Sequence, residues 1–408
     1  MKFGLFYSHQ LPRPWAEDSE RRLMDETLEQ IELADRLGYD AVWCSEHHFL
    51  EEYSHLSAPE LFLAAVSRRT SRIRIGQGIA TLPPAFNPTA RVAERAATLD
   101  LLSGGRYDFG TGESTTLMEL AGFGIDPATK RAQWAEALDA VTRMFVEEPF
   151  AGYDGTYVSM PTRNVLPKPV QKPHPPLWMA CGSREAILTA GRKGLGALNF
   201  AFAEPAETRK WVDAYYATIA SEECVPAGFA VNPQVAAVIP MMCHPDEATA
   251  VERAADGVQF FTYGLGHYIA FGDHAPGRTR LWEEFQRDRR KYGMGRAAMG
   301  GLGGDLGNPA RGAIGTPDQI RRFLRLHEEA GLDQAILIVQ GGGMEHEHIC
   351  ESLELFAREV MPEFRERDEQ ARAQRLERLQ PAIDAALARR EPPRKADPDY
   401  RVKSRKPV

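Results

Sequence analysis

Short apolar runs alternate with amphipathic stretches along almost the whole chain. The short runs are rich in apolar residues, as in strands, whereas the longer stretches repeat their apolar positions near the 3.6-residue period of a helix. Strands are predicted at residues 2–8, 40–45, 72–78, 106–111, 176–181, 195–200, 229–240 and 333–339. Helices are predicted near 20–37, 59–70, 88–102, 130–147, 183–193, 205–222, 245–260, 317–330 and 344–360.

This alternation predicts a parallel α/β fold. Repeated strand–helix units pair their strands in parallel, and eight of them close into a (β/α)₈ barrel. A doubly wound open sheet is the alternative, but it would carry a glycine-rich turn after its first strand, where this chain has Ser8-His9-Gln10-Leu11-Pro12. We therefore predict a single (β/α)₈ TIM barrel over residues 1–362, followed by a charged C-terminal helical extension over 363–408.

Two stretches interrupt the repeat. Residues 148–175 are rich in Pro, Gly and aromatic residues and are predicted to cross the mouth of the barrel. Residues 262–316 contain the run Gly300-Gly301-Leu302-Gly303-Gly304, and a long insertion with such hinges is typical of an active-site lid. Plain disorder is the alternative for 297–312. Residues 363–390 have helical periodicity and are expected to form a partner-docking arm.

Composition excludes several classes of function. The chain is 43% hydrophobic and 26% charged, which is ordinary for a soluble globular protein. Its net charge of −8 divides into +4 for residues 363–408 and −12 for the rest, so no nucleic-acid partner is expected. Five scattered cysteines without a CxxC pair predict neither a disulfide framework nor a thiolate metal site. No signal peptide and no apolar run of about 20 residues is evident, so we expect a cytoplasmic protein without membrane contact.

The clearest candidate chemistry follows the second predicted strand. The apolar run Ala41-Val42-Trp43-Cys44 leads directly into Glu46-His47-His48. The carboxyl ends of parallel strands are where barrel proteins place their active sites. Imidazole titrates near neutral pH, so two histidines at this place favour acid–base or ligand chemistry. A hydrogen-bonded loop pair without catalytic function is the alternative.

Several separated segments together resemble one family, the bacterial luciferase-like monooxygenases, which are flavin-dependent (β/α)₈ barrels. Each segment is a weak signal alone, but their joint occurrence in the right order, from Met1 to about Phe364, is specific to the superfamily. The segments are Met1-Lys2-Phe3-Gly4, Trp43-Cys44-Ser45-Glu46-His47-His48-Phe49, Ile75-Gly76-Gln77-Gly78-Ile79-Ala80-Thr81-Leu82-Pro83, Leu101-Leu102-Ser103-Gly104-Gly105-Arg106, Lys172-Pro173-His174-Pro175-Pro176-Leu177-Trp178 and Ile314-Gly315-Thr316-Pro317.

The resemblance implies a catalytic role for the histidine cluster. His47 matches the histidine on which catalysis in the family depends, and it would act beside the C4a position of the flavin to direct a C4a-peroxide toward substrate. Glu46 or a backbone carbonyl would fix the tautomer of His47. His48 would be its structural partner.

The resemblance also implies where a flavin would lie. Gly78-Ile79, expected at the end of the third strand, would form a non-prolyl cis peptide beneath the isoalloxazine ring. Arg131, near the start of a helix, would bind the phosphate, and the turn Cys181-Gly182-Ser183 would supply further donors.

The fourth strand departs from the family pattern. It is followed by Gly112-Glu113, where the family often has an arginine or another flavin-contacting residue. Gly112 is expected to leave space over the ring. A carboxylate beside an anionic reduced flavin is unfavourable, so Glu113 is expected to face substrate or a lid residue.

The implied function is a monooxygenase. It would take reduced FMN from a separate reductase and use O₂ to oxygenate a small, fairly apolar substrate, with a homodimer as the expected assembly. One alternative is hydride transfer with the deazaflavin F420, and another is a non-catalytic flavin-binding subunit. A metal-dependent hydrolase with ligands from His47-His48 and His346-Glu347-His348 is a third, although i,i+2 side chains on a helix diverge. No metal is predicted.

Overall fold

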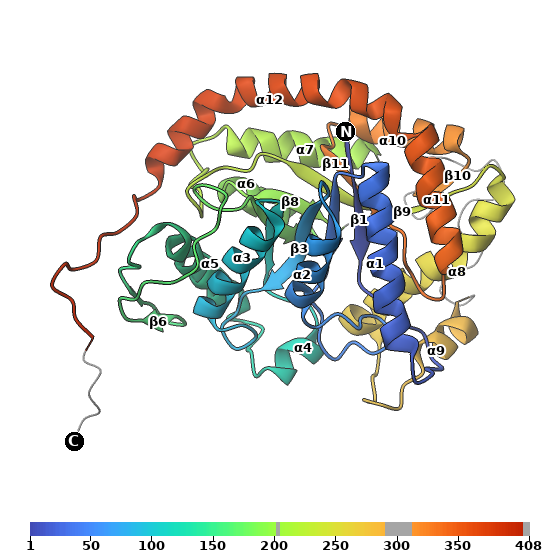
Figure 1. The fold of residues 1–408 in the computed structure, drawn as a ribbon, viewed down its shortest axis with the longest axis horizontal. Coiled ribbons are helices and arrows are strands. Elements are labelled where there is room, and N and C mark those ends of the chain that lie inside the picture. The colour runs from blue at the N-terminus through green and yellow to red at the C-terminus, as the bar shows by residue number, and fades with distance from the viewer. Residues whose placement is uncertain (201–204, 290–311, 403–408) are drawn as a thin grey trace.

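The computed structural model describes residues 1–200, 205–289 and 312–402. Within these residues, eight parallel strands close into a barrel in the order β1-β2-β3-β4-β7-β8-β9-β11, and β11 returns to β1 (Figure 1). The predicted (β/α)₈ barrel is therefore confirmed. The strands are β1 (Lys2–Tyr7), β2 (Ala41–Cys44), β3 (Arg74–Thr81), β4 (Tyr107–Gly112), β7 (Leu177–Cys181), β8 (Gly196–Asn199), β9 (Val235–Cys243) and β11 (Gln334–Ile338).

Helices surround the barrel because each buries one apolar stripe against the strands. In α1, for example, Leu23, Ile31 and Ala34 are buried, and Gly38 ends the helix in the left-handed conformation with φ of 87°. The helices are α1 (Ser19–Leu37), α2 (Pro59–Arg69), α3 (Thr89–Ser103), α4 (Leu117–Gly122), α5 (Lys130–Val146), α6 (Arg184–Arg192), α7 (Pro205–Ile219), α8 (Glu247–Gly266), η1 (His267–Phe271), α9 (Leu281–Asp288), α10 (Pro317–Glu329), α11 (His346–Glu359) and α12 (Met361–Arg389).

Two strands, β3 and β9, differ from their predicted bounds by more than one residue at each end. β3 continues to Thr81, so Gly78 and Ile79 lie inside this strand and not at its end, and the register with β4 shifts between Gln77 and Ala80. The peptide bond between Gly78 and Ile79 is cis, as expected. β9 begins only at Val235, and its last residues pair with the short β10 (Ala313–Gly315).

The prediction that residues 148–175 cross the mouth is wrong. A helix that follows a parallel strand runs back toward the amino ends of the strands, so the segment after α5 starts at the opposite face of the barrel. Gln171 shows this, because its side chain donates to Asp100 Oδ1 and to the Tyr107 carbonyl at the start of β4, each at 2.7 Å. The segment contains a two-stranded hairpin, β5 (Tyr153–Asp154) and β6 (Ser159–Met160).

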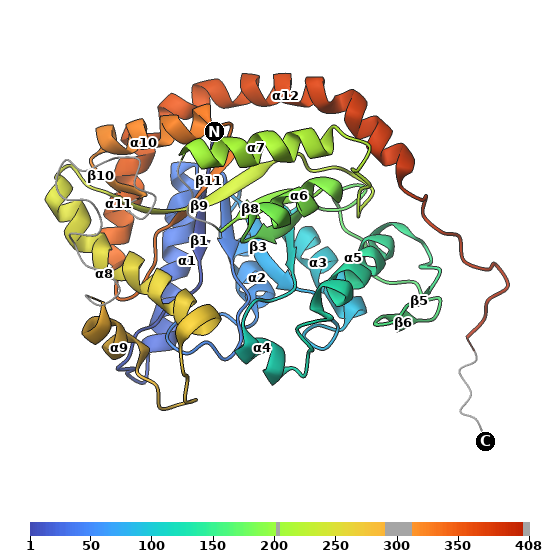
Figure 2. The same ribbon diagram turned by 180° about the vertical axis from the view of Figure 1, so that it is seen from behind.

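The C-terminal extension forms α12, in agreement with its helical period. This helix crosses the face of the barrel where the strands begin, and Figures 1 and 2 show it over both β1 and β11. Ion pairs fix it to its own barrel, including Arg367 to Glu328 at 2.7 Å and Arg390 to Asp139 at 2.5 Å. The extension therefore docks on its own chain. The predicted glycine hinges at 300–304 lie outside the described residues.

Candidate active site

Glu46 anchors the loop that follows β2. Its carboxylate is buried and accepts hydrogen bonds from the backbone N–H of Thr81 at 3.0 Å and from Asn87 Nδ2 at 2.8 Å. His48 Nε2 lies 3.1 Å from the same carboxylate. The Glu46–His48 pair thus ties the β2 loop to the carboxyl end of β3, which keeps the segment around Gly78-Ile79 in register with the histidines.

His47 has a different partner from the one expected. Its Nδ1 lies 3.1 Å from Glu119 Oε1, and Glu119 belongs to α4. The expectation that Glu46 or a backbone carbonyl fixes the His47 tautomer is therefore wrong, because Glu46 is already used by His48, Thr81 and Asn87.

Glu119 is held as an anion at this place. Burial on its own raises the pKa of its carboxyl, but the charge and hydrogen bond of His47, together with donors from Thr116 and the His48 N–H, outweigh burial and lower the pKa to about 2. An ionised Glu119 accepts from Nδ1–H of His47, so in the neutral imidazole Nε2 is the free acceptor nitrogen. His47 and Glu119 together form a hydrogen-bonded imidazole–carboxylate pair.

Glu119 was missed by sequence reasoning, although a local signal existed. Thr116-Leu117-Met118-Glu119 is a capping-box pattern, and the Thr116 hydroxyl accepts from the Glu119 N–H at 3.2 Å. That pattern would have placed a short helix here. It would not have shown that the Glu119 carboxylate turns toward His47, 72 residues away in the sequence.

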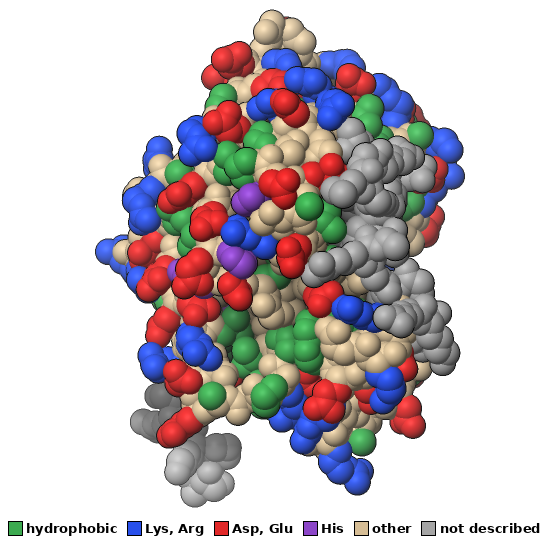
Figure 3. All heavy atoms as spheres, turned by 90° about the vertical axis from the view of Figure 1, so that its right-hand side faces the viewer, with side chains coloured by type: hydrophobic (Ala, Val, Ile, Leu, Met, Phe, Trp, Pro, Cys, Tyr) green, Lys and Arg blue, Asp and Glu red, His purple; other side chains and the backbone are tan. Residues whose placement is uncertain are grey.

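Aromatic side chains make the surroundings of His47 apolar. The ring of Tyr53 lies edge-on to His47 at 5.6 Å between centroids, and Phe261 lies at 5.6 Å and Tyr268 at 6.3 Å from Tyr53. Burial, followed by the charge of Glu119, raises the pKa of Tyr53, so its phenol stays protonated. Figure 3 shows the molecule from the right-hand side of Figure 1, and hydrophobic side chains line a hollow in the lower half of that view.

Gly112 does not leave open space, contrary to expectation. A Cβ at Gly112 would lie 2.6 Å from Ile79 Cδ1, so the Ile79 side chain already fills the position beside it. The missing side chain of Gly112 therefore allows Ile79 of the cis peptide to pack against the end of β4.

Glu113 faces the candidate phosphate residue. Its carboxylate lies 3.2 Å from Arg131 and 3.9 Å from Lys130, both at the start of α5. Glu113 therefore faces these two cations, and not substrate or a lid residue as expected. Arg131 nevertheless keeps a side chain that is 52% exposed, so it can still reach a ligand.

The turn after β7, Cys181-Gly182-Ser183, leaves its backbone accessible at Gly182. Cys181 is buried and its thiol donates to the Met179 carbonyl, while burial raises the thiol pKa against the opposing charge of Arg131. The Ser183 hydroxyl caps α6 by accepting from the Ala186 N–H at 3.3 Å. Among the described residues, no atom other than those of its chain neighbours lies within 4 Å of a Cβ placed on Gly182. β4 and β7 are neighbours in the barrel, so this turn lies next to the end of β4, where Glu113 pairs with Arg131.

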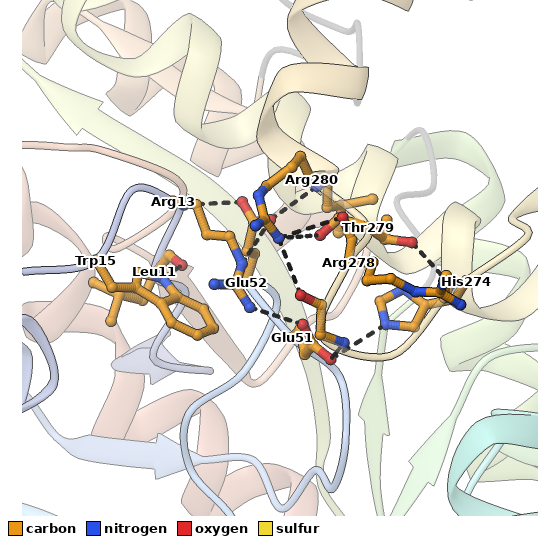
Figure 4. Close-up of polar contacts among 12 residues, drawn as sticks. Leu11, Arg13, Trp15, Glu51, Glu52, His274, Arg278, Thr279 and Arg280 are labelled. Carbon is orange, nitrogen blue, oxygen red and sulfur yellow. Dashed lines mark hydrogen bonds and ion pairs between the residues drawn. The ribbon is translucent and has the colours of Figure 1, made fainter.

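Two further acidic residues connect the β2 loop to the insertion (Figure 4). Glu52 is fully buried and accepts from the backbone N–H groups of Arg13, Leu281 and Trp282 at 2.8–3.1 Å. Glu51 accepts from the Gly277 N–H at 2.7 Å and pairs with Arg13 at 2.9 Å. We call Glu51 and Glu52 the acidic clamp. It positions the start of α9 beside the site.

The histidines of α11 are not brought to the site. His346 Nδ1 lies 3.1 Å from the Gln30 side chain of α1, and His348 Nε2 lies 3.5 Å from Glu345. In the described part of the chain, no group of three or more His, Cys, Asp or Glu residues is arranged to hold a metal ion. Nor does any helix there have the length and apolarity to cross a membrane.

Fold and site define a (β/α)₈ barrel with a polar cluster at the carboxyl ends of its strands. Within that class, the chain belongs to the luciferase-like monooxygenase family, whose model matches residues 1–334. The match leaves α12 outside the family's common region.

Two curated relatives illustrate the similarity. The 4-hydroxyprotoasukamycin monooxygenase of Streptomyces nodosus subsp. asukaensis is 39% identical over 150 residues, which is 36% of this chain and 39% of that protein. The limonene 1,2-monooxygenase of Rhodococcus erythropolis is 27% identical over 372 residues, or 89% of this chain and 86% of the relative. The first three curated relatives are matched over only 39% to 53% of their length.

Solved structures share the fold over most of the chain. The monooxygenase RslO1 of Streptomyces bottropensis superposes with a TM-score of 0.72 at 25% identity, covering 89% of this chain and all (100%) of that one. The oxygenating constituent of 3,6-diketocamphane monooxygenase from Pseudomonas putida, in complex with FMN, gives 0.67 at 19%, covering 89% and 98%. An F420-dependent secondary alcohol dehydrogenase gives 0.65 at 16%, covering 88% and 98%.

Proposed function

We propose that this protein is a monooxygenase that uses reduced FMN, supplied by a separate reductase, and O₂ to oxygenate a small, fairly apolar organic substrate. The observation that carries the proposal is the His47–Glu119 pair, which holds an imidazole among aromatic rings at the barrel mouth. Relatives named for limonene and diketocamphane oxygenation support an apolar substrate.

The residues present fit a flavin phosphate. Arg131 is half exposed, Gly182 leaves room for an approaching oxygen atom, and the Ser183 hydroxyl and the amides that begin α6 are donors. We therefore assign Arg131, Gly182 and Ser183 to the phosphate and Gly78-Ile79 to the ring. Glu113 would share Arg131 with the phosphate, because its Oε1 contacts the guanidinium at 3.2 Å while the arginine side chain stays 52% exposed. When bound, the flavin would supply the redox chemistry with O₂.

The chain's own residues would handle protons and water. His47 would accept or return a proton at Nε2, while Glu119 holds Nδ1–H and stabilises the imidazolium when it forms. Tyr53, Phe261 and Tyr268 would exclude water from the reacting groups and bind the apolar part of the substrate. His48 and Glu46 would act as positioning residues, because both are engaged with each other.

The test is turnover with externally reduced FMN. We would supply reduced FMN and O₂ with limonene or a camphor-type ketone as probe, and measure oxygenated product and hydrogen peroxide. His47→Gln should lower product formation by about 10²–10⁴-fold, the usual contribution of a general acid–base. His348→Gln, a histidine change on α11, is the matched control and should leave product formation unchanged. An unaltered rate in His47→Gln would contradict the proposed role.

F420-dependent hydride transfer is the second candidate, because the fold also superposes on an F420-dependent dehydrogenase. F420 binding with oxidation of a secondary alcohol, and no product from reduced FMN, would establish it. Flavin binding without any turnover would indicate a non-catalytic subunit.

A homodimer is also proposed, through α2 and α3. These helices expose Leu61, Leu101 and Leu102, which are 71%, 47% and 40% accessible. Light scattering should give twice the chain mass, and Leu61→Glu should reduce it to the monomer.

A further inference from the structure

A crevice lies at the end of the barrel opposite the candidate active site. It has two lobes of about 320 and 440 Å³, which share Lys2, Gln171 and Arg372. Its floor is made by the amino ends of the strands, including Lys2 of β1 and Arg74 of β3, and α12 supplies Arg372 from the other side. Each lobe has the size of a small-molecule site.

The lining is basic although the chain as a whole is acidic. It contains six Lys and Arg side chains and four Asp side chains, in a protein whose net charge is −8. The basic residues are Lys2, Arg72, Arg74, Lys172, Arg372 and Arg375. Six basic and four acidic side chains give the lining a formal charge of +2, which is opposite in sign to the charge of the whole protein.

The carboxylates of the crevice already have partners. Asp108 pairs with Arg74 at 2.6 Å, and Asp333 pairs with Arg375. Asp368 pairs with the N-terminal ammonium at 2.9 Å. Asp40 accepts from the Phe3 N–H, and burial outweighs this bond and the charge of Lys2 to raise its pKa. Each carboxylate thus has a nearer partner, and the charges of Asp40, Asp368 and Asp108 on Lys2 do not outweigh burial and Arg372.

Two cations are left without such a partner. Within the described residues, neither Lys2 nor Arg372 makes an ion pair or a side-chain hydrogen bond, and both line both lobes. They also act on each other: burial first, and then the charge of Arg372, lower the pKa of the Lys2 ammonium, and the opposing charges of Asp40, Asp368 and Asp108 do not cancel this effect. An anion placed between them would relieve this repulsion and replace the hydration that Lys2 has lost.

We propose that this crevice is a second ligand site, which binds a small polyanion between Lys2 and Arg372. The ligand carries at least two negative charges on phosphate or carboxylate groups, because it must satisfy two separated cations. Arg372 can bind either group in bidentate geometry, and Lys2 acts as a point charge. The site depends on α12, which the family model does not cover.

Inorganic pyrophosphate and citrate are suitable probes, titrated separately by calorimetry at constant ionic strength. One saturable site is expected, with affinity about tenfold lower in Lys2→Met and in Arg372→Gln, the loss typical of one charge-assisted contact. The tighter probe identifies phosphate or carboxylate chemistry. Arg322→Gln, an exposed arginine on α10 outside the crevice, is the matched control and should bind as the wild type does.

Binding at the candidate flavin-phosphate residues must be separated from binding here. Affinity that survives in Arg131→Gln but falls in both crevice variants supports the proposal, and the reverse pattern overturns it. Absence of saturable binding to wild type with either probe also overturns it. As a residue-level readout, the bound probe should slow acetylation of Lys2 by acetic anhydride, followed by mass spectrometry, and unchanged labelling would contradict the assignment.

Discussion

Removing the Glu52 carboxylate should release the start of α9 from the barrel. Glu52 accepts from three backbone N–H groups, those of Arg13, Leu281 and Trp282, at 2.9, 2.8 and 3.1 Å. Leu281 and Trp282 are the first residues of α9, so the carboxylate caps this helix from a distant part of the chain. Its negative charge also complements the positive end of the helix dipole. In Glu52→Ala, all three donors lose their acceptor.

The size of the effect follows from those three donors. A buried donor left without an acceptor costs ~1–3 kcal/mol, so the closed state loses ~3 kcal/mol even at the low end. Water can satisfy the donors once the segment detaches. Glu52→Ala should therefore shift the opening equilibrium of the segment at the start of α9 roughly 100-fold toward the open form, without global unfolding. The shift in Glu52→Gln should lie between those of the wild type and Glu52→Ala. The glutamine amide oxygen can replace one carboxylate oxygen, whereas its NH₂ group cannot accept a hydrogen bond.

Hydrogen–deuterium exchange followed by mass spectrometry is the assay. The amides of Leu281 and Trp282 should exchange roughly 100-fold faster in Glu52→Ala. Glu283→Gln is the matched control, since this exposed acidic residue lies on the same turn of α9. Wild-type protection in Glu52→Ala would refute the reasoning. Equal loss in the Glu283→Gln control would refute it as well, because the effect would then belong to general charge and not to the cap.

Three further predictions concern the site and its support. The folded pKa of Glu119, about 2, lies below the ordinary 4.5, so its stabilisation is complete above about pH 4.5 and is lost toward pH 2. Urea unfolding across this range should show a loss on the order of 3 kcal/mol, and Glu119→Gln should flatten the profile. Gly112→Ala would place a Cβ 2.6 Å from Ile79 Cδ1. The substitution should weaken FMN binding in a fluorescence titration while the melting temperature stays near that of the wild type. An unchanged affinity would show that Ile79 does not contact the flavin. Gly76→Ala would place a Cβ 2.3 Å from Trp43 Cε3 and should destabilise the barrel by about 1–3 kcal/mol in urea unfolding, and an unchanged midpoint would contradict this packing.

Local patterns predicted the barrel because its units are local. β2 is a run of four buried residues, and the polar cluster that follows must lie at the carboxyl end of that strand in any parallel sheet. The pattern therefore located Glu46, His47 and His48 correctly in the fold. It does not place residues 148–175, because aromatic content does not show at which face of the barrel α5 ends.

The pairings within the site depend on contacts between distant residues, which periodicity does not contain. Glu119 meets His47 across 72 residues of sequence, and Glu52 meets Leu281 across 229. A carboxylate on a short helix and one in a loop look like ordinary solvated acids in the sequence. Only the folded chain shows that both are buried acceptors.

The arrangement of the β2 loop has a consequence for how changes elsewhere affect His47. Glu46 ties the loop to β3, Glu119 ties His47 to α4, and the acidic clamp ties it to Arg13 and α9. Tyr53, the residue after the clamp, packs edge-on against His47. Because the hydrogen bonds of a buried network support one another, displacement of α9 would move Tyr53 and alter the environment of the imidazole. Substitutions in the clamp should therefore reduce proton transfer at His47 before they reduce the stability of the barrel, since no strand of the barrel depends on the clamp for its hydrogen bonds.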